Sequence, residues 1–476
     1  MRDAFSTQAL RLLALCRFLL LLLVVVVPAS GVSAQTSLTV GLYPYVPRLA
    51  QFEAAIQERW AQVEPGVSLT FVSEETWDGG YKKDPTGIDV FVFDAMFFEY
   101  FRSQNWLDAL QPNEIANLTD FVDYAIDGVK VGSQYFAIPL LGCTNILFYQ
   151  KDDAELQRAT TLSEINGALS QCTYTSQIPP DRRGIMTDMA SGTTNAALYL
   201  DAHHSMTGVY PMPLPQSKAE IDPAALENLR ELLRMASFWN GTQDKRIFSE
   251  RDLEPYERAS WFSGGYGRAL IGFTESMSAM SQATRDSIDF KVMPLSDRQS
   301  RPLFYADVIG VNGAIADKRT RDLAVKLANL IADSETVLAS IGPDDSNPDP
   351  QYLMTTRPSV FEALGKDFPI YRKMYGLLTS SNPIMFGVSD QSRAWLNKMK
   401  DVIRSDVQAG YTCGCDRKSS QPIFNNADAQ GKCPLTCADH GGWNGQWTNG
   451  PPAPGSVCGC NSCPLDMASD SEAPPY

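Results

Sequence analysis

Histidine and net positive charge are both scarce in this sequence. Its 476 residues include three histidines, and 55 acidic residues outnumber 40 basic ones, for a formal net charge of −15. A nucleic-acid partner calls for a basic face, so none is expected. The histidines, His203, His204 and His440, lie outside every candidate strand considered below. A cysteine–histidine couple of the protease type is therefore not expected, and His203 and His204 are interpreted as polar-face residues rather than metal ligands.

Long apolar runs are also missing, except near the N-terminus. Three arginines precede the apolar run Phe18–Val27, and Val32-Ser33-Ala34 supplies a small-x-small cleavage pattern. This arrangement is typical of a secretory signal peptide over residues 1–34. The run is short for a membrane span, and a retained anchor is the alternative. Removing residues 1–34 takes away three arginines and one aspartate, which changes the net charge from −15 to −17. We expect a secreted, extracellular or periplasmic protein that has no membrane contact after signal removal.

The mature chain, about 440 residues long, exceeds one ordinary core, so more than one domain is expected. Its body, residues 35–408, alternates short apolar strands with longer helices, which indicates an α/β fold class. The expected strands include Leu38–Leu42, Ile88–Phe93 and Ile288–Val292, and the expected helices include Val46–Val63, Pro223–Phe238 and Lys318–Ala332.

Cys143 lies in the apolar run Ile138–Tyr149, which has the shape of a segment that crosses between the lobes of a two-lobed solute-binding protein. A binding protein needs no thiol at this place, whereas an enzyme that forms a covalent intermediate does. The alternative is that Cys143 is a small buried hydrophobe. Leu270–Met277 is interpreted as a second buried strand that carries a lone carboxylate, Glu275. A carboxylate there is costly unless it is paired or near water, so the two side chains suggest a nucleophile and its base.

Further polar and aromatic side chains follow or lie within the other expected strands. Tyr43 and Tyr45 come after Leu38–Leu42, Asp94 follows Ile88–Phe93, and the strand from Phe304 carries Tyr305 and Asp307. Ligands of open α/β sheets collect at the carboxyl ends of strands, which predicts that these side chains line a cleft. Alternatively, the aromatic residues belong to the core and the aspartates cap helices.

In this order and spacing, the segments resemble the thiaminase type I (thiamine pyridinylase) family over roughly residues 37–406. The resemblance implies a two-lobed, type 2 periplasmic-binding-protein-like fold. It also implies that Cys143 is the nucleophile and Glu275 its base. The implied substrate-binding residues are Asp94 and Asp307 for the aminopyrimidine, Tyr43, Tyr45 and Tyr305 as aromatic walls, and one further tyrosine, either Tyr256 or Tyr266. Family members often have tyrosine where this chain has Phe273, which removes one hydroxyl group.

The implied chemistry fits these side chains. Thiamine would be cleaved by exchange of its thiazole for a nucleophilic co-substrate, an amine, a pyridine or a thiol, without any cofactor. A carboxylate beside a thiol raises the thiol pKa, so Glu275 would act by accepting the thiol proton during attack. Tyrosine faces would stabilise the thiazolium cation by about 1 kcal/mol.

After residue 406 the composition changes to a cysteine-rich segment, residues 411–465, followed by a tail, residues 466–476, that is expected to be disordered. The segment contains Cys413, Cys415, Cys433, Cys437, Cys458, Cys460 and Cys463. In a secreted chain this density indicates disulfides. Without Cys16 of the signal and a free Cys143, eight cysteines remain, so Cys172 can complete four bridges. Zinc binding by the Cys-Gly-Cys pairs is the alternative.

The segments 422–430 and 441–448 are similar to one repeat of the mannan-binding lectins, which implies affinity for mannose-type glycans. The candidate carbohydrate-binding residues are Asn425, Asn426, Asp428, Trp443, Gln446 and Trp447. Phe424 stands where these lectins usually have tryptophan, and a single repeat predicts weak binding. The alternative is that Trp443 and Trp447 form the core of a small disulfide-bonded domain.

Three functions therefore compete. The first is a thiamine-cleaving enzyme with a carbohydrate-binding-like module. The second is a non-catalytic extracellular solute-binding protein for thiamine or a sugar. The third is an interaction protein that acts through its lectin-like tail.

Overall fold

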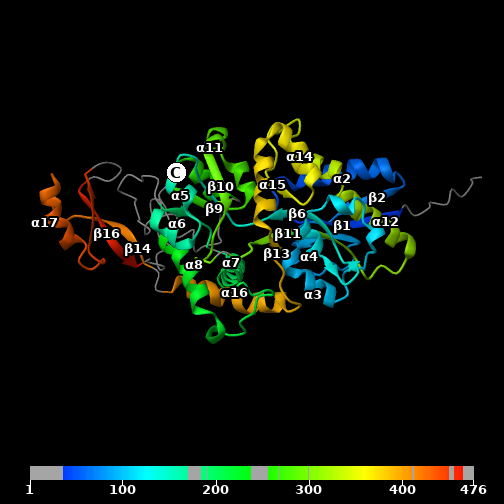
Figure 1. Ribbon diagram of the computed structural model, residues 1–476, viewed down its shortest axis with the longest axis horizontal. Helices are drawn as coiled ribbons and strands as arrows, with labels where there is room; N and C mark the ends of the chain where they lie inside the picture. Colours follow the sequence, from blue (N-terminus) through cyan, green and yellow to red (C-terminus); the bar gives the residue numbers. More distant parts are fainter. Residues whose placement is uncertain are drawn as a thin grey trace, which may run out of the picture.

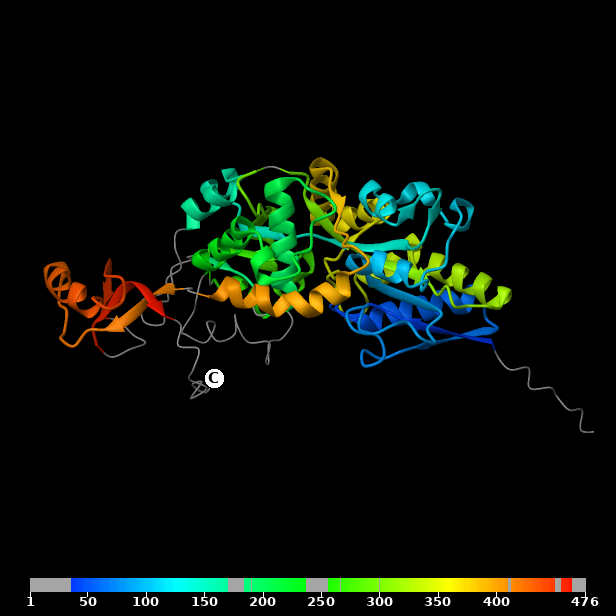
Figure 2. The same cartoon turned by 90° about the horizontal axis from the view of Figure 1, so that it is seen from below.

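The structure is a computed structural model that describes residues 36–169, 184–189, 191–236, 256–265, 267–298, 300–409, 412–449 and 455–464. The expectations for residues 1–34 and 466–476, for Cys172 and Tyr266, and for the side chains of Cys413, Cys415 and Cys463 lie outside this description. Two α/β lobes lie side by side, and a small C-terminal module stands at the far end of the second lobe (Figures 1 and 2).

The first lobe is built on a seven-stranded mixed sheet in the order β12-β6-β11-β3-β1-β2, with β13 paired to β11. Its strands are β1 (Thr36–Gly41), β2 (Val67–Phe71), β3 (Val90–Asp94), β6 (Ile138–Cys143), β11 (Leu303–Val311), β12 (Met354–Thr355) and β13 (Ile384–Met385). β1 is parallel to β2 and β3, whereas β11 runs antiparallel to β3 and β6. Packed around this sheet are α2 (Leu49–Val63), α4 (Asp123–Gly128), α12 (Lys318–Ile331), α13 (Ser334–Ile341), α14 (Pro358–Asp367) and α15 (Pro369–Ser381).

The second lobe is built on a four-stranded sheet in the order β10-β7-β9-β8. Its strands are β7 (Ile146–Gln150), β8 (Ile185–Met186), β9 (Ala269–Gly272) and β10 (Ile288–Val292). Three of its helices, α7 (Gly192–Thr207), α8 (Pro223–Met235) and α16 (Ser392–Gln408), pack against one another. The chain passes between the lobes after β6, after β10 and after β13, so the lobes are discontinuous in sequence.

The expected α/β class and two-lobed fold are confirmed, and most expected elements exist with small shifts at their ends. β10 has the expected bounds, and α12 and α8 begin where expected. α2 begins at Leu49 because Pro47 and the preceding turn stay outside the helix. None of the helices in the described ranges combines the length and hydropathy needed to span a bilayer.

One expectation about Glu275 is wrong, because its segment is not a strand through to Met277. β9 ends at Gly272, and Thr274–Ala279 form a 3₁₀ helix, η5, with Glu275 in its first turn. The chain turns tightly here, with Ser276 N donating to Phe273 O and Ser278 Oγ donating to Glu275 O at 2.6 Å. Serine hydroxyls that bond local backbone groups compete with a strand ladder, which explains the early end of β9.

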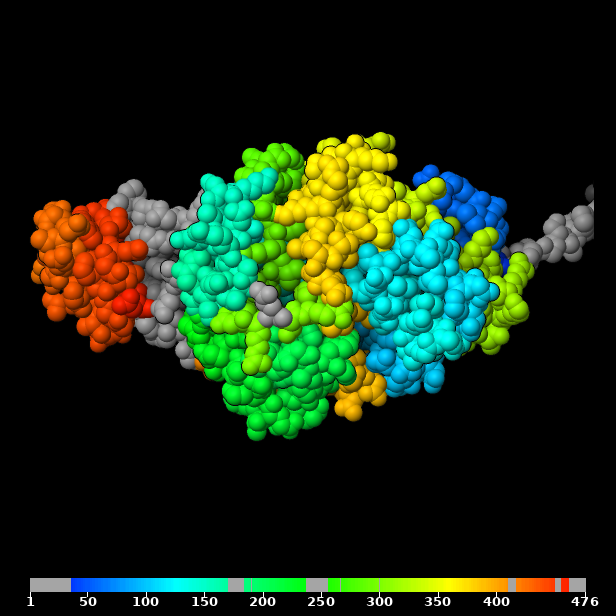
Figure 3. Space-filling view, in the orientation of Figure 1, coloured from blue at the N-terminus to red at the C-terminus, as the bar shows by residue number. Residues whose placement is uncertain are grey.

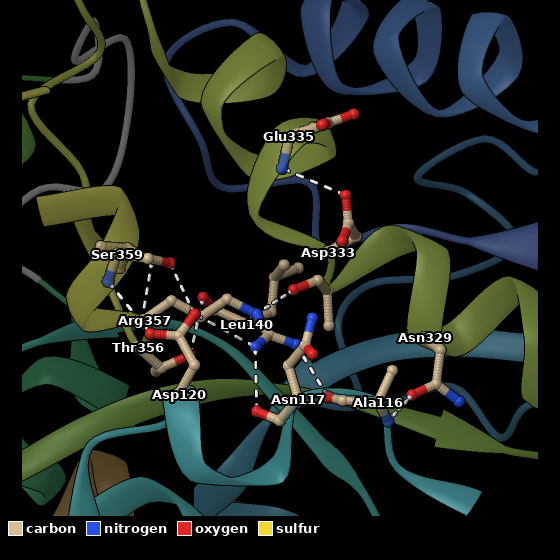
Figure 4. Close-up of polar contacts among 12 residues, drawn as sticks. Ala116, Asn117, Asp120, Leu140, Asn329, Asp333, Glu335, Thr356, Arg357 and Ser359 are labelled. Carbon is tan, nitrogen blue, oxygen red and sulfur yellow. Dashed lines mark hydrogen bonds and ion pairs between the residues drawn. The ribbon is translucent and has the colours of Figure 1, made fainter. Parts of the chain in front are cut away.

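A buried arginine ties the loops behind β6 together (Figure 4). Arg357 is 2% exposed, and its guanidinium donates to the carbonyl oxygens of Ala332, Asn117 and Ala116 and reaches Asp120 Oδ2 at 3.5 Å. The adjacent Thr356 donates its hydroxyl to Leu140 O at 3.1 Å. The network therefore anchors the strand that carries Cys143 to helices and loops from distant parts of the sequence.

The C-terminal module is a three-stranded sheet, β14 (Thr412–Lys418), β16 (Val457–Pro464) and β15 (Trp443–Thr448), with helix α17 (Asn426–Thr436) packed on it. The disulfides Cys433–Cys458 and Cys437–Cys460 join α17, and the residue after it, to β16. The expectation of disulfides is confirmed for these four cysteines, which are therefore not zinc ligands. Their sulfur atoms, with Ile423 and Ala429, form the small core of the module.

Candidate active site

A cavity of about 460 Å³ lies between the two lobes, which meet along a seam in the space-filling view (Figure 3). Eight of the sequence-predicted residues line it: Tyr43, Tyr45, Asp94, Cys143, Tyr256, Glu275, Tyr305 and Asp307. Tyr266, the other candidate for the further tyrosine, lies outside the described residues. Tyr256 precedes α10 (Glu257–Ser263) of the second lobe and faces the cavity.

Cys143 is the last residue of β6 and carries a free, half-buried thiol. It lies opposite Tyr305 in the β6–β11 pairing. The preceding residue has to be glycine, because a Cβ on Gly142 would lie 2.2 Å from the hydroxyl oxygen of Tyr124. That hydroxyl donates to Tyr305 O at 3.3 Å, and Thr144 Oγ1 donates to Leu303 O at 3.0 Å. These contacts hold the thiol at the cavity edge of the first lobe.

Burial raises the pKa of the Cys143 thiol well above its usual value, and the charge of Glu275 raises it further. The thiol is therefore protonated at neutral pH and needs a base before it can act as a nucleophile. The two groups line the same cavity, although they come from different lobes.

Glu275 has the properties of such a base. It is buried in the first turn of η5, and its Oε2 has no hydrogen-bond partner among the described residues. Burial raises its pKa to about 7. A carboxyl group that titrates near neutrality can accept a proton and return it within one reaction cycle.

Asp94 and Asp307 form a pair of carboxyl groups in the first lobe. They lie opposite each other where β3 pairs with β11. Asp94 accepts hydrogen bonds from Met96 N and from the Tyr81 hydroxyl, both at 2.9 Å, so it both caps the 3₁₀ helix η1 (Ala95–Phe97) and faces the cavity. Burial raises the pKa of Asp94 to about 6, and burial together with the Asp94 charge raises that of Asp307 well above its usual value. The pair therefore shares about one negative charge near neutral pH.

Aromatic rings surround this pair. Tyr43 and Tyr45 meet edge to face with ring centroids 5.3 Å apart, and Tyr45 lies 5.9 Å from Tyr81. Tyr305 stacks on Phe386 at 4.6 Å and has Phe273 edge-on at 6.1 Å. Such rings can contact both faces of a flat ligand and stabilise its positive charge.

The residues that were not predicted from the sequence include Tyr81 and Asn145, which line the cavity, and Asp201, which accepts from Asn145 outside the lining. Tyr81 follows Gly79 and Gly80, which both have positive φ angles and let the chain pass close to Tyr43 and Phe101. The Gly-Gly pair before Tyr81 is the sequence feature from which this residue could have been predicted. Asn145 was identifiable as the polar residue of the β6–β7 crossing, whereas Asp201, in the middle of α7, carries no local signal.

In the C-terminal module, several candidate carbohydrate-binding groups already bond to protein. Asn425 caps α17 by accepting from Asp428 N at 2.9 Å, and Asp428 accepts from Phe424 N at 3.1 Å. Trp447 Nε1 donates to Asn426 Oδ1 at 2.9 Å, and Trp443 Nε1 donates to the carbonyl oxygen of Gln446. Both tryptophans pack partly against the disulfide core, while Phe424 is 75% exposed. The six residues are thus brought together at α17 and β15.

Two lobes on separate sheets, three chain crossings and an interlobe cavity define a periplasmic-binding-protein-like fold. The maltose-bound MalE3 of T. maritima shares this fold at 13% identity, with a TM-score of 0.55 over 79% of this chain and 95% of that one.

Relatives of higher identity include two thiaminases. A thiaminase-1 from Paenibacillus thiaminolyticus is 35% identical over 393 residues, which cover 81% of this chain and 93% of the relative. Thiaminase I of Clostridium botulinum, solved in complex with thiamin, is 34% identical with a TM-score of 0.72, covering 78% of this chain and all of that one. The thiaminase-1 domain model matches residues 144–296. This chain belongs to the thiaminase I family.

The mannan-binding protein family model matches residues 426–460, within the C-terminal module. Both resemblances expected from the sequence are therefore confirmed.

Proposed function

We propose that this chain is a secreted thiamine pyridinylase, a transferase that replaces the thiazole of thiamine with a nucleophilic base or thiol. One observation carries the proposal: a free thiol from the first lobe and a buried carboxyl group from the second, with one oxygen unpartnered among the described residues, line one cavity together with a pair of acidic residues. The membership in the thiaminase I family and the thiamin complex of a relative support it.

In the proposed reaction, Cys143 and Glu275 act as nucleophile and base. The sulfur of Cys143 adds to the pyrimidine ring as Glu275 takes the thiol proton. The bond between the bridging methylene carbon and the thiazolium nitrogen then breaks, and its electron pair leaves with the neutral thiazole. An incoming nucleophile bonds to the methylene carbon; an amine or a thiol then gives its proton to solvent, whereas pyridine has none to lose and becomes a pyridinium. The ring then expels the sulfur, which recovers its proton from Glu275.

The remaining cavity residues bind the substrate in this proposal. Asp94 and Asp307 together carry about one negative charge, which matches the single positive charge of thiamine and provides acceptors for its amino group. Tyr43, Tyr45, Tyr256 and Tyr305 supply aromatic walls. Phe273 supplies a ring edge without a hydroxyl group.

Exchange of thiazole for pyridine, followed by chromatography of the products, tests this function directly. Cys143→Ser should lower turnover at least about a thousandfold, and Glu275→Gln about a hundredfold or more. Both variants should bind thiamine within a few-fold of the unchanged protein. Binding of thiamine without turnover by the unchanged protein would instead identify a solute-binding protein, and turnover that survives Cys143→Ser would refute the thiol mechanism.

We further propose that residues 1–34 are a secretory signal, residues 35–408 the catalytic body and residues 411–465 a carbohydrate-binding module. The match to the mannan-binding family and the cluster of amide and indole groups at α17 and β15 support a mannose-type ligand. An oligomannose array with the full chain tests the module. We expect the full chain to bind oligomannose and Trp447→Ala to abolish this binding. An array without any mannose-dependent signal would show that the module does not bind these glycans.

A further inference from the structure

A buried polar chain connects the second lobe to the active site through the crossing residue Asn145. Asn145 Nδ2 donates to Asp201 Oδ2 on α7 at 2.9 Å and to the Tyr305 hydroxyl on β11 at 3.4 Å. Asp201 and Asn145 are 7% and 6% exposed, so water does not readily replace these partners. The three residues come from α7, the β6–β7 crossing and β11, which the fold alone brings together.

The direction of these hydrogen bonds follows from the chemistry of the three groups. Burial raises the pKa of Asp201 to about 7, so above that pH the group is an ionised carboxylate. An ionised carboxylate accepts hydrogen bonds and cannot donate, and Asp201 then requires the amide NH₂ of Asn145 to face it. The same NH₂ then also faces Tyr305, whose oxygen becomes an acceptor. The phenolic proton of Tyr305 must therefore point elsewhere.

Tyr305 lines the cavity, so that proton can point into it. Among the described residues Asn145 is the hydrogen-bond partner of the Tyr305 hydroxyl, which leaves the phenolic proton available to a ligand in the cavity. The ring itself cannot rotate away, since it stacks on Phe386 at 4.6 Å and its backbone carbonyl accepts from Tyr124.

We propose that Asp201 is a positioning residue that acts through Asn145 to make the Tyr305 hydroxyl a hydrogen-bond donor to the bound aminopyrimidine. The donor complements the Asp94–Asp307 pair, whose ionised carboxylate is an acceptor, so the site offers both kinds of group to a ring that carries nitrogen lone pairs and an amino group. Tyr305 is then a polar recognition group as well as an aromatic wall. This inference rests on the proposed function and extends it to a residue outside the cavity lining.

A double-mutant cycle on kcat/KM for thiamine with pyridine tests the relay. Tyr305→Phe keeps the stacked ring and removes the hydroxyl, and we expect about a tenfold loss, the size of one hydrogen bond to substrate. Asp201→Leu should cause a similar loss in the unchanged background. In the Tyr305→Phe background Asp201→Leu should add less than about twofold, because its effect passes through the missing hydroxyl.

Asp201→Asn provides the second variant, because it keeps the shape and decides the question should Asp201→Leu fail to fold. Its amide accepts either orientation of Asn145, so we expect a loss of about threefold that disappears when Tyr305 is phenylalanine. Ser205→Ala is the matched control. It lies one turn further along α7, bonds Ser296 at 2.9 Å outside the relay, and should leave kcat/KM unchanged.

Losses that multiply in the double variants, or full activity of Asp201→Asn, would overturn the relay and leave Asp201 a structural residue. These outcomes are distinct from failure of the proposed function, in which the unchanged protein itself does not exchange thiazole. Thermal unfolding of each variant separates a loss of folded protein from a loss of positioning.

Discussion

Asp307 lies directly opposite Asp94 in the antiparallel pairing of β11 with β3, and both carboxyl groups face the same cavity. Two carboxyl groups so arranged cannot both ionise easily, and burial adds to the cost. The site consequently changes its charge near neutral pH, well above the range in which exposed aspartates titrate.

The first prediction concerns the pH dependence of thiamine binding. The pKa of Asp94 is raised to about 6, so this carboxyl group is neutral at pH 5 and charged at pH 8. Since thiamine is a cation, its affinity should rise about tenfold over this interval. Titration calorimetry with the Cys143→Ser/Glu275→Gln variant checks this without turnover and without titration of Glu275. Adding Asp94→Asn should flatten the curve, and an affinity that falls with rising pH would contradict the assignment.

The second prediction concerns the loss of folding stability that results from burying the ionised form of Glu275. Its folded-state pKa of about 7 lies above the unfolded value, so the unfolded chain releases the proton more readily as pH rises from 4 to 7. The contribution of Glu275 to stability therefore falls over that interval. Glu275→Gln should raise the free energy of unfolding at pH 8 by about 3 kcal/mol and change it little at pH 4. Urea unfolding at both pH values measures this, and equal effects at the two would refute it.

The third prediction concerns the glycine before the thiol. A methyl group at Gly142 would meet the hydroxyl of Tyr124, whose ring is held against Phe304 with centroids 5.5 Å apart. Gly142→Ala should therefore displace the end of β6, destabilise the protein by about 1–3 kcal/mol and lower kcat. Tyr124→Phe removes the clashing oxygen, so the double variant should recover most of both losses. A double variant no better than Gly142→Ala would show that another contact excludes the methyl group.

The fourth prediction concerns the buried arginine behind β6. Arg357→Met removes the guanidinium donor from the carbonyl oxygens of Ala332 and Asn117 and the cation from Asp120 (Figure 4). Loss of one member of such a buried network should destabilise the protein by about 3–5 kcal/mol. Calorimetric unfolding checks this against Arg319→Met, an exposed arginine on α12 that should change stability by less than about 0.5 kcal/mol. Equal unfolding temperatures for the two variants would contradict this account of Arg357.

The expectations from the sequence were strongest where function depends on the ends of strands. Cys143 and Asp94 end the apolar strands β6 and β3, as expected. Tyr305 and Asp307 lie within β11 rather than at its end, and its antiparallel pairing sets them opposite Cys143 and Asp94. The elements themselves were predictable for the same reason, since hydrophobic periodicity reports burial directly.

The rest depends on tertiary structure that periodicity does not report. Glu275 was expected at a strand end, but local hydroxyl–backbone bonds turn its segment into a 3₁₀ helix. Asp201 lies in the middle of a helix, and only the packing of α7 on the crossing segment gives it a partner in Asn145. No pattern along the chain distinguishes it from an aspartate on a solvated helix face.

In the proposed reaction Cys143 forms a covalent bond to the pyrimidine of thiamine. Intact-protein mass spectrometry after incubation with thiamine, without an added nucleophile, tests it most directly. We predict a mass increase equal to thiamine less its thiazole, mapped by peptide digestion to Cys143 and absent from Cys143→Ser. A protein that exchanges thiazole but never carries this adduct, or carries it equally in Cys143→Ser, would contradict the account.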